Sequence, residues 1–225
     1  MALAIFDLDN TLLAGDSDHL WGEFVIDLGL VDADTYRQQN EQFYRDYCRG
    51  ELDIYAYQRF ALAPLVGRDP AELARWHDQF MQRYIEPIIL PKGEALIAEH
   101  KARGDTVMII TATNTFITRP IARRLGVDIL LGTEVEVDSH GRFTGEIVGT
   151  PTFQQGKVVR LQQWLNEQDA TLADSHFYSD SHNDIPLLQQ VDHPVAVDPD
   201  EKLAHYAQQQ GWPIISLREQ AAKEY

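Results

Sequence analysis

The sequence predicts an α/β protein with a Rossmann-like, doubly wound parallel sheet as its core and an inserted α-helical bundle as a cap. From residue 89 onward, short apolar runs typical of buried strands alternate with helical segments, the pattern of a parallel sheet covered on both faces. The segment between the first strand and the next is helical throughout and interrupts this alternation. We therefore expect a core domain of residues 1–15 and 89–225 and a cap domain of residues 16–88.

The first strand and the cap helices come first along the chain. The apolar run ALAIF, residues 2–6, predicts a buried strand. Apolar residues at three-to-four spacing in the segments that follow predict a small helical bundle. Asp69 followed by Pro70 is a typical helix start, because aspartate caps the helix and proline suits its first position. The predicted cap helices lie within residues 18–29, 32–50, 53–67 and 69–85.

The core alternates between strands and helices. The run TVMIIT is continuous and β-branched, which predicts a strand buried on both faces. The stretch TEVEVDSHGRFTGEIV alternates around an Asp-Ser-His-Gly turn and predicts a hairpin. Strands are expected within residues 106–111, 133–148, 176–180, 194–198 and 213–217, and helices within 92–104, 116–126, 156–168, 183–191 and 200–211.

Composition excludes several classes of function. The formal net charge of −16 over 225 residues, with no Lys/Arg run of five or more, indicates an acidic surface, so we expect no binding to nucleic acid or to a membrane. Cys48 is the only cysteine, which excludes an internal disulfide and a cysteine zinc site. With no apolar run of 18 residues and no signal-peptide pattern, we expect a cytoplasmic protein. The oligomeric state is left open.

Polar side chains gather where three of the predicted strands end. Asp7 and Asp9 follow the first strand, Thr111 and Thr113 end the second, and Asp180 ends a third. Ligands of open α/β sheets bind just beyond the carboxyl ends of the strands. Clustered carboxylates are tolerated when a hard cation lies among them, and oxygen ligands in an open site suit Mg²⁺, which commonly shares its shell with water and a phosphate. A magnesium site that shares its ligands with water and a phosphate is therefore predicted here.

This set of side chains suits phosphoryl transfer. An aspartate such as Asp7 can attack phosphorus and form an aspartyl phosphate. Asp9, two residues further on, can protonate the leaving oxygen and later take a proton from water. Thr111 and Lys157, which opens a helix just after Gly156, would hold the phosphoryl oxygens.

The chain resembles the haloacid dehalogenase-like superfamily, on its phosphoserine phosphatase side. The resemblance is carried, in the family's order, by FDLDNTLL, IITAT, GKVVRL and YSDSHNDIPLL. It implies a phosphatase with a helical cap between the first two stretches, in which Asp7 is the nucleophile and Asp9 the general acid and base. Thr111 would bind phosphate, and Lys157 would neutralise charge on the phosphate and the nucleophile.

The resemblance also implies a metal site and its surroundings. Mg²⁺ would be held by the Asp7 carboxylate, the Asp9 backbone carbonyl and Asp180, with Asn183 and Asp184 behind these ligands. One departure is the second stretch, which has Thr-Ala-Thr at residues 111–113 where relatives often have Ser-Gly-Gly.

The substrate is predicted from four candidate residues: Asp16, Asp18, Arg59 and Thr113. By resemblance, Asp16 and Arg59 occupy the positions that bind the ammonium and the carboxylate of phosphoserine. Asp18 adds a second carboxylate beside His19 and Trp21, and this set suits a substrate with two basic groups.

L-Histidinol phosphate has an ammonium and an imidazole and no carboxylate, and the chain also resembles family members described as histidinol-phosphatases. We therefore expect histidinol phosphate, with phosphoserine or another small phosphate as the alternatives. One of Asp16 and Asp18 is expected to cap the first cap helix instead.

Other classes share part of this pattern. Phospho-accepting receiver domains combine clustered aspartates, a hydroxyl, a lysine and Mg²⁺, but they lack the helical insertion and the second aspartate of the acid/base position. A phosphomutase shares the chemistry but keeps its phosphoenzyme from water. A calcium loop over residues 7–18 would need Gly at Leu12 and Glu at Asp18.

Overall fold

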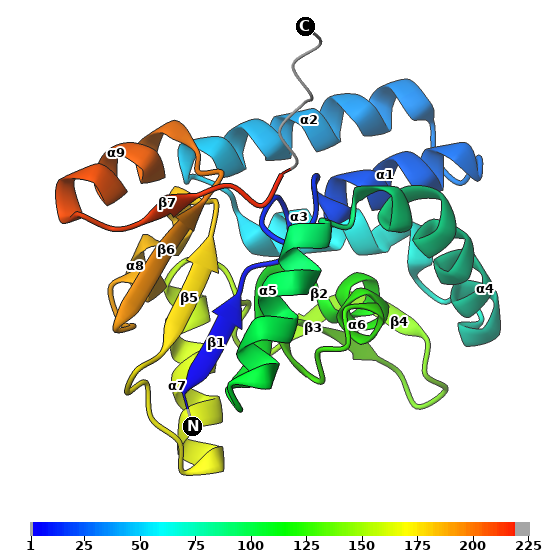
Figure 1. Cartoon of the computed structure of the whole chain (residues 1–225). Coiled ribbons are helices and arrows are strands. Elements are labelled where there is room, and N and C mark those ends of the chain that lie inside the picture. Colours follow the sequence, from blue (N-terminus) through cyan, green and yellow to red (C-terminus); the bar gives the residue numbers. More distant parts are fainter. Residues whose placement is uncertain (1, 219–225) are drawn as a thin grey trace, which may run out of the picture.

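The computed structural model describes residues 2–218 and contains a seven-stranded sheet of order β4-β3-β2-β1-β5-β6-β7 (Figure 1). Every neighbouring pair is parallel except the predicted hairpin of β3 and β4. The strands are β1 Leu3–Phe6, β2 Thr106–Asn114, β3 Ile129–Val137, β4 Phe143–Val148, β5 His176–Ser179, β6 His193–Val197 and β7 Ile214–Ile215. The predicted fold class is confirmed. Residue 1 and residues 219–225 of the predicted core domain lie outside the described residues.

The helices follow the predicted order. They are α1 Ser17–Asp27, α2 Ala33–Arg49, α3 Ile54–Leu62, α4 Pro70–Phe80, α5 Pro91–Ala102, α6 Thr115–Arg124, α7 Gln155–Gln168, α8 Ile185–Leu188 and α9 Glu201–Gln210. Helix α3 is shorter than predicted and continues as a 3₁₀ turn that contains Pro64, which has no backbone N–H to donate. None of the helices within the described residues is long and apolar enough to cross a membrane.

Each helix of the inserted segment starts at an aspartate. The four side-chain caps, which accept backbone N–H groups of the first turn, are Asp16, Asp32, Asp53 and Asp69. Such caps satisfy donors that have no partner within the helix. The arrowheads of β1 and β5 point toward α2 (Figure 1), so this segment covers the end of the sheet where ligands of this fold bind.

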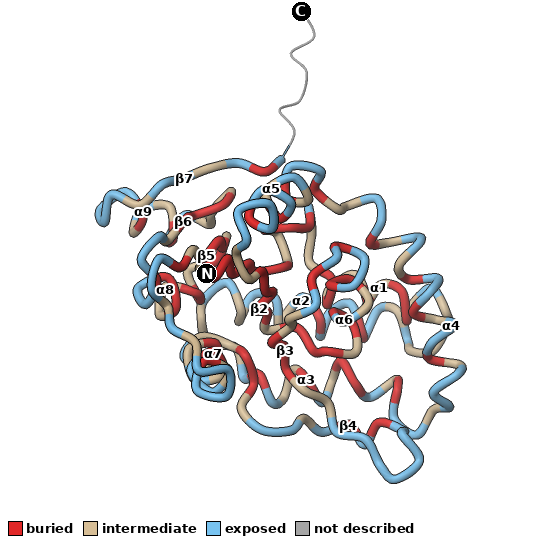
Figure 2. The backbone as a smooth tube through the Cα atoms, turned by 60° about the horizontal axis from the view of Figure 1, so that its bottom comes forward, coloured by how far each residue is buried: buried red, intermediate tan, exposed pale blue. Residues whose placement is uncertain are grey.

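Two apolar clusters cover the two faces of the sheet. Ala4 and Phe6 of β1 belong to one cluster, and Leu3 and Ile5 belong to the other. This alternation is what a strand buried on both faces requires. In Figure 2 the buried stretches follow the central strands, and the exposed stretches follow the outer sides of the helices.

The inserted helices share the first of these clusters with the core. Trp21 of α1 is 1% exposed and packs edge-to-face against Phe116 of α6, with ring centroids 5.2 Å apart. Two linkers join the insertion to the core, and they pair with each other through an antiparallel bridge between Leu13 and Ile89. The Ala14 N–H donates to the Ile88 carbonyl at 2.7 Å. The inserted segment is therefore joined to the core by two hydrogen-bonded linkers and by a continuous apolar contact.

His77 of α4 lies in this apolar contact and makes stability depend on pH. Its Nε2 lies 3.0 Å from the Ile117 carbonyl oxygen, and burial lowers the pKa of His77 below its usual 6.5. A lowered folded-state pKa contributes stability above the unfolded pKa, and this stability is lost as pH falls. Gln in place of His77 keeps a donor for Ile117 but does not titrate. We expect the difference in unfolding free energy between wild type and H77Q to shrink from about pH 7.5 to about pH 5.5. Parallel denaturation curves would contradict this.

Candidate active site

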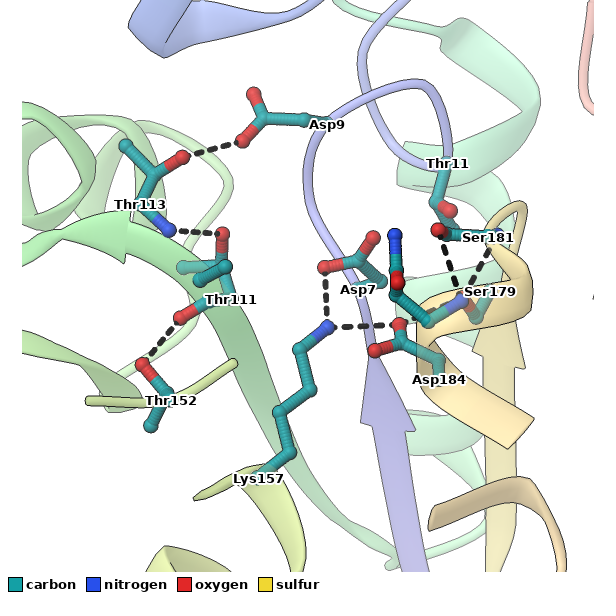
Figure 3. Close-up of polar contacts among 12 residues, drawn as sticks. Asp7, Asp9, Thr11, Thr111, Thr113, Thr152, Lys157, Ser179, Ser181 and Asp184 are labelled. Atoms are coloured by element: carbon teal, nitrogen blue, oxygen red, sulfur yellow. Dashed lines mark hydrogen bonds and ion pairs between the residues drawn. The ribbon is translucent and has the colours of Figure 1, made fainter. Parts of the chain in front are cut away.

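The structure brings Asp7, Asp9, Thr111 and Lys157 together at the carboxyl ends of β1 and β2 (Figure 3). They line a cavity with an empty volume of about 420 Å³, which we call the inner pocket. Four of the five residues predicted from strand ends, Asp7, Asp9, Thr111 and Thr113, thus line one space, because parallel strands end at the same edge of the sheet, whereas Asp180 lies outside its lining.

Lys157 holds two carboxylates at the base of the inner pocket. Its Nζ donates to Asp7 Oδ1 at 2.9 Å and to Asp184 Oδ2 at 2.7 Å (Figure 3). Burial by itself lowers the pKa of Lys157, but the charges of Asp184 and Asp7 outweigh it and raise that pKa. Gly156 permits this placement, since a Cβ there would lie 1.9 Å from the Pro151 carbonyl oxygen. The pocket therefore contains a permanent ammonium group.

Asp7 continues the line of β1 into the pocket. Its backbone N–H donates to the Tyr178 carbonyl at 2.9 Å, which extends the pairing of β1 with β5. Burial raises the pKa of Asp7 to about 6, with Lys157 opposing and Asp184 adding to the rise. At neutral pH the carboxylate is ionised, the form that a nucleophile needs.

Asp9 is held through both of its carboxylate oxygens. Oδ1 accepts the Ser17 N–H at 2.7 Å, and Oδ2 accepts the Thr113 hydroxyl at 2.8 Å. Burial first and the charge of Asp16 second raise the pKa of Asp9 to about 7. A group that titrates near neutral pH is suited to both donate and accept protons. Since Ser17 begins α1, the inserted segment positions this carboxylate directly.

The carboxyl end of β2 is irregular where it meets the pocket. The register between β2 and β3 shifts between Ile110 and Asn114. Such an irregularity changes the direction of nearby side chains. Thr111 Oγ1 accepts the Thr113 N–H at 3.2 Å, and the Thr111 carbonyl accepts the Thr152 hydroxyl at 2.6 Å (Figure 3). The Thr113 hydroxyl at this irregular end of β2 donates to Asp9.

The acidic side chains around Lys157 fit a divalent cation. Burial and the charges of Asp7 and Asp184 raise the pKa of Asp180 well above its usual value. Thr11 Oγ1 donates to Asp180 Oδ1 at 3.0 Å. Lys157 pairs with Asp7 and Asp184, and no cationic side chain within residues 2–218 forms an ion pair with Asp180, so negative charge remains to be balanced.

The ligand chemistry favours Mg²⁺ over zinc. Asp7, Asp180 and the Asp9 carbonyl offer oxygen atoms only. Within the described residues, no three His, Cys, Asp or Glu side chains are grouped closely enough to complete a metal site by themselves. A site with few protein oxygens leaves room for water and phosphate, the coordination that Mg²⁺ keeps. The residues present therefore fit this ion.

The two residues predicted behind the metal have separate contacts. Asp184 Oδ2 accepts Lys157 and also the Ser179 hydroxyl at 2.7 Å. Asn183 links the core to α2, since its Nδ2 donates to the Tyr47 carbonyl at 3.2 Å. Its Oδ1 accepts Gln154 Nε2 at 2.9 Å.

A second cavity lies beside the inner pocket, between α1, α2 and α3. It has an empty volume of about 460 Å³, and we call it the aromatic cavity. The two cavities share Asp16, Tyr47, Ala112 and Thr113 as lining residues. The side chains specific to the aromatic cavity are Asp18, His19, Asn40, Phe43, Tyr44, Leu52, Ile54, Tyr57 and Gln58.

Asp16 and Asp18 have different tasks. Asp16 Oδ1 caps α1 by accepting the N–H groups of Asp18 and His19, both at 2.9 Å. Asp18 is 7% exposed, and its Oδ1 has no hydrogen-bond partner in the protein. Burial, Asp16 and Asp9 raise the pKa of Asp18 well above its usual value. Asp16 is the helix cap that the sequence left unassigned, and Asp18 is a buried carboxyl that lines the aromatic cavity.

Two residues named with the substrate candidates, Arg59 and Trp21, lie outside both cavities. Arg59 lines neither cavity: its exposed side chain donates from Nε to Glu146 of β4 at 2.9 Å. Trp21 also lines neither cavity, because it is buried in the apolar cluster. The aromatic neighbours of Asp18 are instead tyrosines such as Tyr44 and Tyr57. The helical spacing of these tyrosines is as typical of residues that pack against another helix as of residues that line a cavity. The sequence therefore contained no signal that marked them as cavity residues.

The fold and this constellation define a phosphatase. The haloacid dehalogenase-like hydrolase family model matches residues 4–189, so the chain belongs to this family. The protein is a phosphoric monoester hydrolase. This assignment argues against the alternative that it is a phospho-accepting receiver domain.

The chain is also similar to individual proteins of known name or structure. Over 219 residues the chain is 48% identical to histidinol-phosphatase of Neisseria meningitidis serogroup C (strain 8013), covering 96% of this chain and 99% of that protein. It is 34% identical over 224 residues to phosphoserine phosphatase SerB1 of Mycobacterium tuberculosis (strain ATCC 25618 / H37Rv), covering 96% and 71%. A solved structure from Bordetella pertussis Tohama I, of unknown function, has a TM-score of 0.90 at 43% identity, covering 96% and 99%.

Proposed function

We propose that this phosphatase hydrolyses L-histidinol phosphate, a small amino-alcohol phosphate, with Mg²⁺ and through an aspartyl phosphate on Asp7. One observation carries the choice of substrate. The aromatic cavity is lined by two carboxyl groups and several aromatic rings, and none of its described lining residues is Lys or Arg. Such a cavity suits basic and aromatic groups and offers no cation for a substrate carboxylate.

The inner pocket supplies the chemistry. Asp7 attacks phosphorus, forming a P–O bond as the ester P–O bond breaks, and Asp9 gives its proton to the leaving alcohol oxygen. Asp9 then takes a proton from a water molecule whose oxygen attacks phosphorus. The acyl phosphate bond breaks, inorganic phosphate leaves and Asp7 is restored. Lys157 holds Asp7 ionised and in place before it attacks. Bound Mg²⁺ would offset negative charge on the phosphoryl oxygens.

The similarity in sequence supports the same substrate. The relative that is 48% identical over nearly its whole length is named a histidinol-phosphatase. Phosphoserine remains the second candidate, because the relative at 34% identity is named a phosphoserine phosphatase. The carboxylate of phosphoserine would face Asp16 and Asp18 in the aromatic cavity. Arg59, the candidate partner for that carboxylate, is paired with Glu146 on the surface instead.

Parallel steady-state kinetics test this proposal. We expect kcat/KM for L-histidinol phosphate to exceed that for L-phosphoserine by at least about 100-fold, because the carboxylate of phosphoserine would face carboxyl groups without a cation. A higher kcat/KM for phosphoserine would contradict the assignment. Low values for both, with p-nitrophenyl phosphate still hydrolysed, would retain the reaction class and overturn the substrate.

A further inference from the structure

The aromatic cavity contains two buried polar atoms without partners in the protein. They are Asp18 Oδ1 and Gln58 Nε2, and both side chains line the cavity. Gln58 is 1% exposed and Asp18 is 7% exposed. Unpaired buried polar atoms are costly, so they point to a group that a ligand supplies. By contrast, His19 and Asn40 in the same cavity contact each other, with Asn40 Nδ2 lying 3.2 Å from His19 Nδ1.

The orientation of the Gln58 amide follows from its neighbour. Asn114 caps α6, and its Oδ1 accepts the Ile117 N–H at 3.2 Å. Its Nδ2 is therefore the end left to donate, and it lies 3.4 Å from Gln58 Oε1. With its oxygen facing Asn114, the Gln58 side chain has the unpaired Nε2 donor to offer a ligand.

The two unpaired atoms have opposite hydrogen-bonding roles. Asp18 Oδ1 offers an acceptor, and Gln58 Nε2 offers a donor. An ammonium group has donors only, so it can satisfy Asp18 but not Gln58. A neutral imidazole has one N–H and one unprotonated nitrogen, and it can satisfy both.

The order of the cavities matches the order of groups in the substrate. In L-histidinol phosphate the ammonium lies between the phosphate and the imidazole. The inner pocket contains Asp7 and Lys157, the shared wall contains Asp16, and the aromatic cavity contains Asp18 and Gln58.

We infer that Asp18 and Gln58 together select a neutral imidazole ring, whose N–H donates to Asp18 Oδ1 while Gln58 Nε2 donates to the other ring nitrogen. This inference rests on the proposed function and extends it, because it assigns ring recognition to Gln58, a residue with no part in phosphoryl transfer. Asn114 is the positioning residue that fixes which end of the Gln58 amide meets the ring.

The test compares substrates with and without the ring. O-Phosphoethanolamine keeps the phosphate and the ammonium but has no imidazole. The measured quantity is kcat/KM for L-histidinol phosphate divided by kcat/KM for O-phosphoethanolamine, in which effects on the shared chemistry cancel. The variant is Gln58→Met, which keeps the side-chain length and removes the amide. The matched control is Gln79→Met, on an exposed position of α4.

We expect Gln58→Met to lower this ratio by roughly 10-fold or more, because one ring nitrogen loses its donor, and Gln79→Met to leave it unchanged. A wild-type ratio near unity would overturn the proposed substrate itself. A high wild-type ratio that Gln58→Met leaves unchanged would overturn only the role of Gln58. If the Met variant loses activity on both substrates, Gln58→Asn decides: its shorter amide is expected to lower the ratio, and an unchanged ratio would refute the inference.

Discussion

Replacing Asp7 by Asn is expected to reduce kcat by at least about 10⁴-fold while the protein remains folded. The amide has the shape of the carboxylate, and its oxygen can still accept the hydrogen bond that Lys157 now gives to Asp7 Oδ1. It cannot form an aspartyl phosphate. The measurement is phosphate release by purified D7N, with circular dichroism to check the fold.

The matched control is Asp128→Asn, which makes the same change at an exposed position outside both cavities. This variant is expected to keep wild-type kcat. Mass spectrometry of D7N excludes reversion by deamidation. Substantial turnover by intact D7N would refute Asp7 as the nucleophile.

Removing Mg²⁺ is expected to abolish activity and to lower the melting temperature. Asp7 and Asp184 share the Lys157 ammonium group, and the charge of Asp180 acts against both carboxylates, so without a divalent cation this repulsion is unbalanced. EDTA is expected to inactivate the enzyme, and excess Mg²⁺ is expected to restore turnover and raise the melting temperature.

The melting temperature of the Asp180→Asn variant reports metal binding independently of turnover. The variant removes one proposed ligand and one of the repelling charges, so its melting temperature is expected to respond much less to Mg²⁺. Full activity of the wild-type enzyme in EDTA would contradict the proposed cofactor. An equal Mg²⁺ response in D180N would place the ion elsewhere.

The fold was predictable because its signals are local. The apolar run of β1, the continuous apolar run of β2 and the turn between β3 and β4 each specify an element within a few residues. The inner pocket was predictable for a related reason. The ends of parallel strands meet at one edge, so Asp7 and Thr111 are brought together by topology alone.

The substrate side was less predictable, because it depends on how the inserted helices pack. Arg59 was placed by spacing along the sequence, but the orientation of α3 brings it to Glu146 on β4. Gln58, its neighbour in sequence, lies on a different face of the helix and lines the aromatic cavity. A difference of one residue changes the helical face, and only the tertiary contacts of α3 decide which face meets the site.

The roles of Asp16 and Asp18 also depend on tertiary contacts that the sequence pattern does not reveal. Both suit a helix start, and two residues of separation leave either of them able to cap it. The structure assigns the cap to Asp16 through two N–H groups. Asp18 is buried because α2 and α3 cover it with side chains such as Tyr57, a contact between segments that periodicity does not reveal.

Trapping the phosphorylated enzyme tests the role of Asp7 as nucleophile most directly. Wild-type protein turning over L-histidinol phosphate with Mg²⁺ would be quenched in acid within the first turnovers, digested and analysed by mass spectrometry. The proposed mechanism predicts one added phosphoryl group on Asp7, absent from the D7N variant and lost when the substrate is exhausted. Steady turnover with the peptide containing Asp7 unmodified at every quench time, or the phosphoryl group on a different residue, would contradict it.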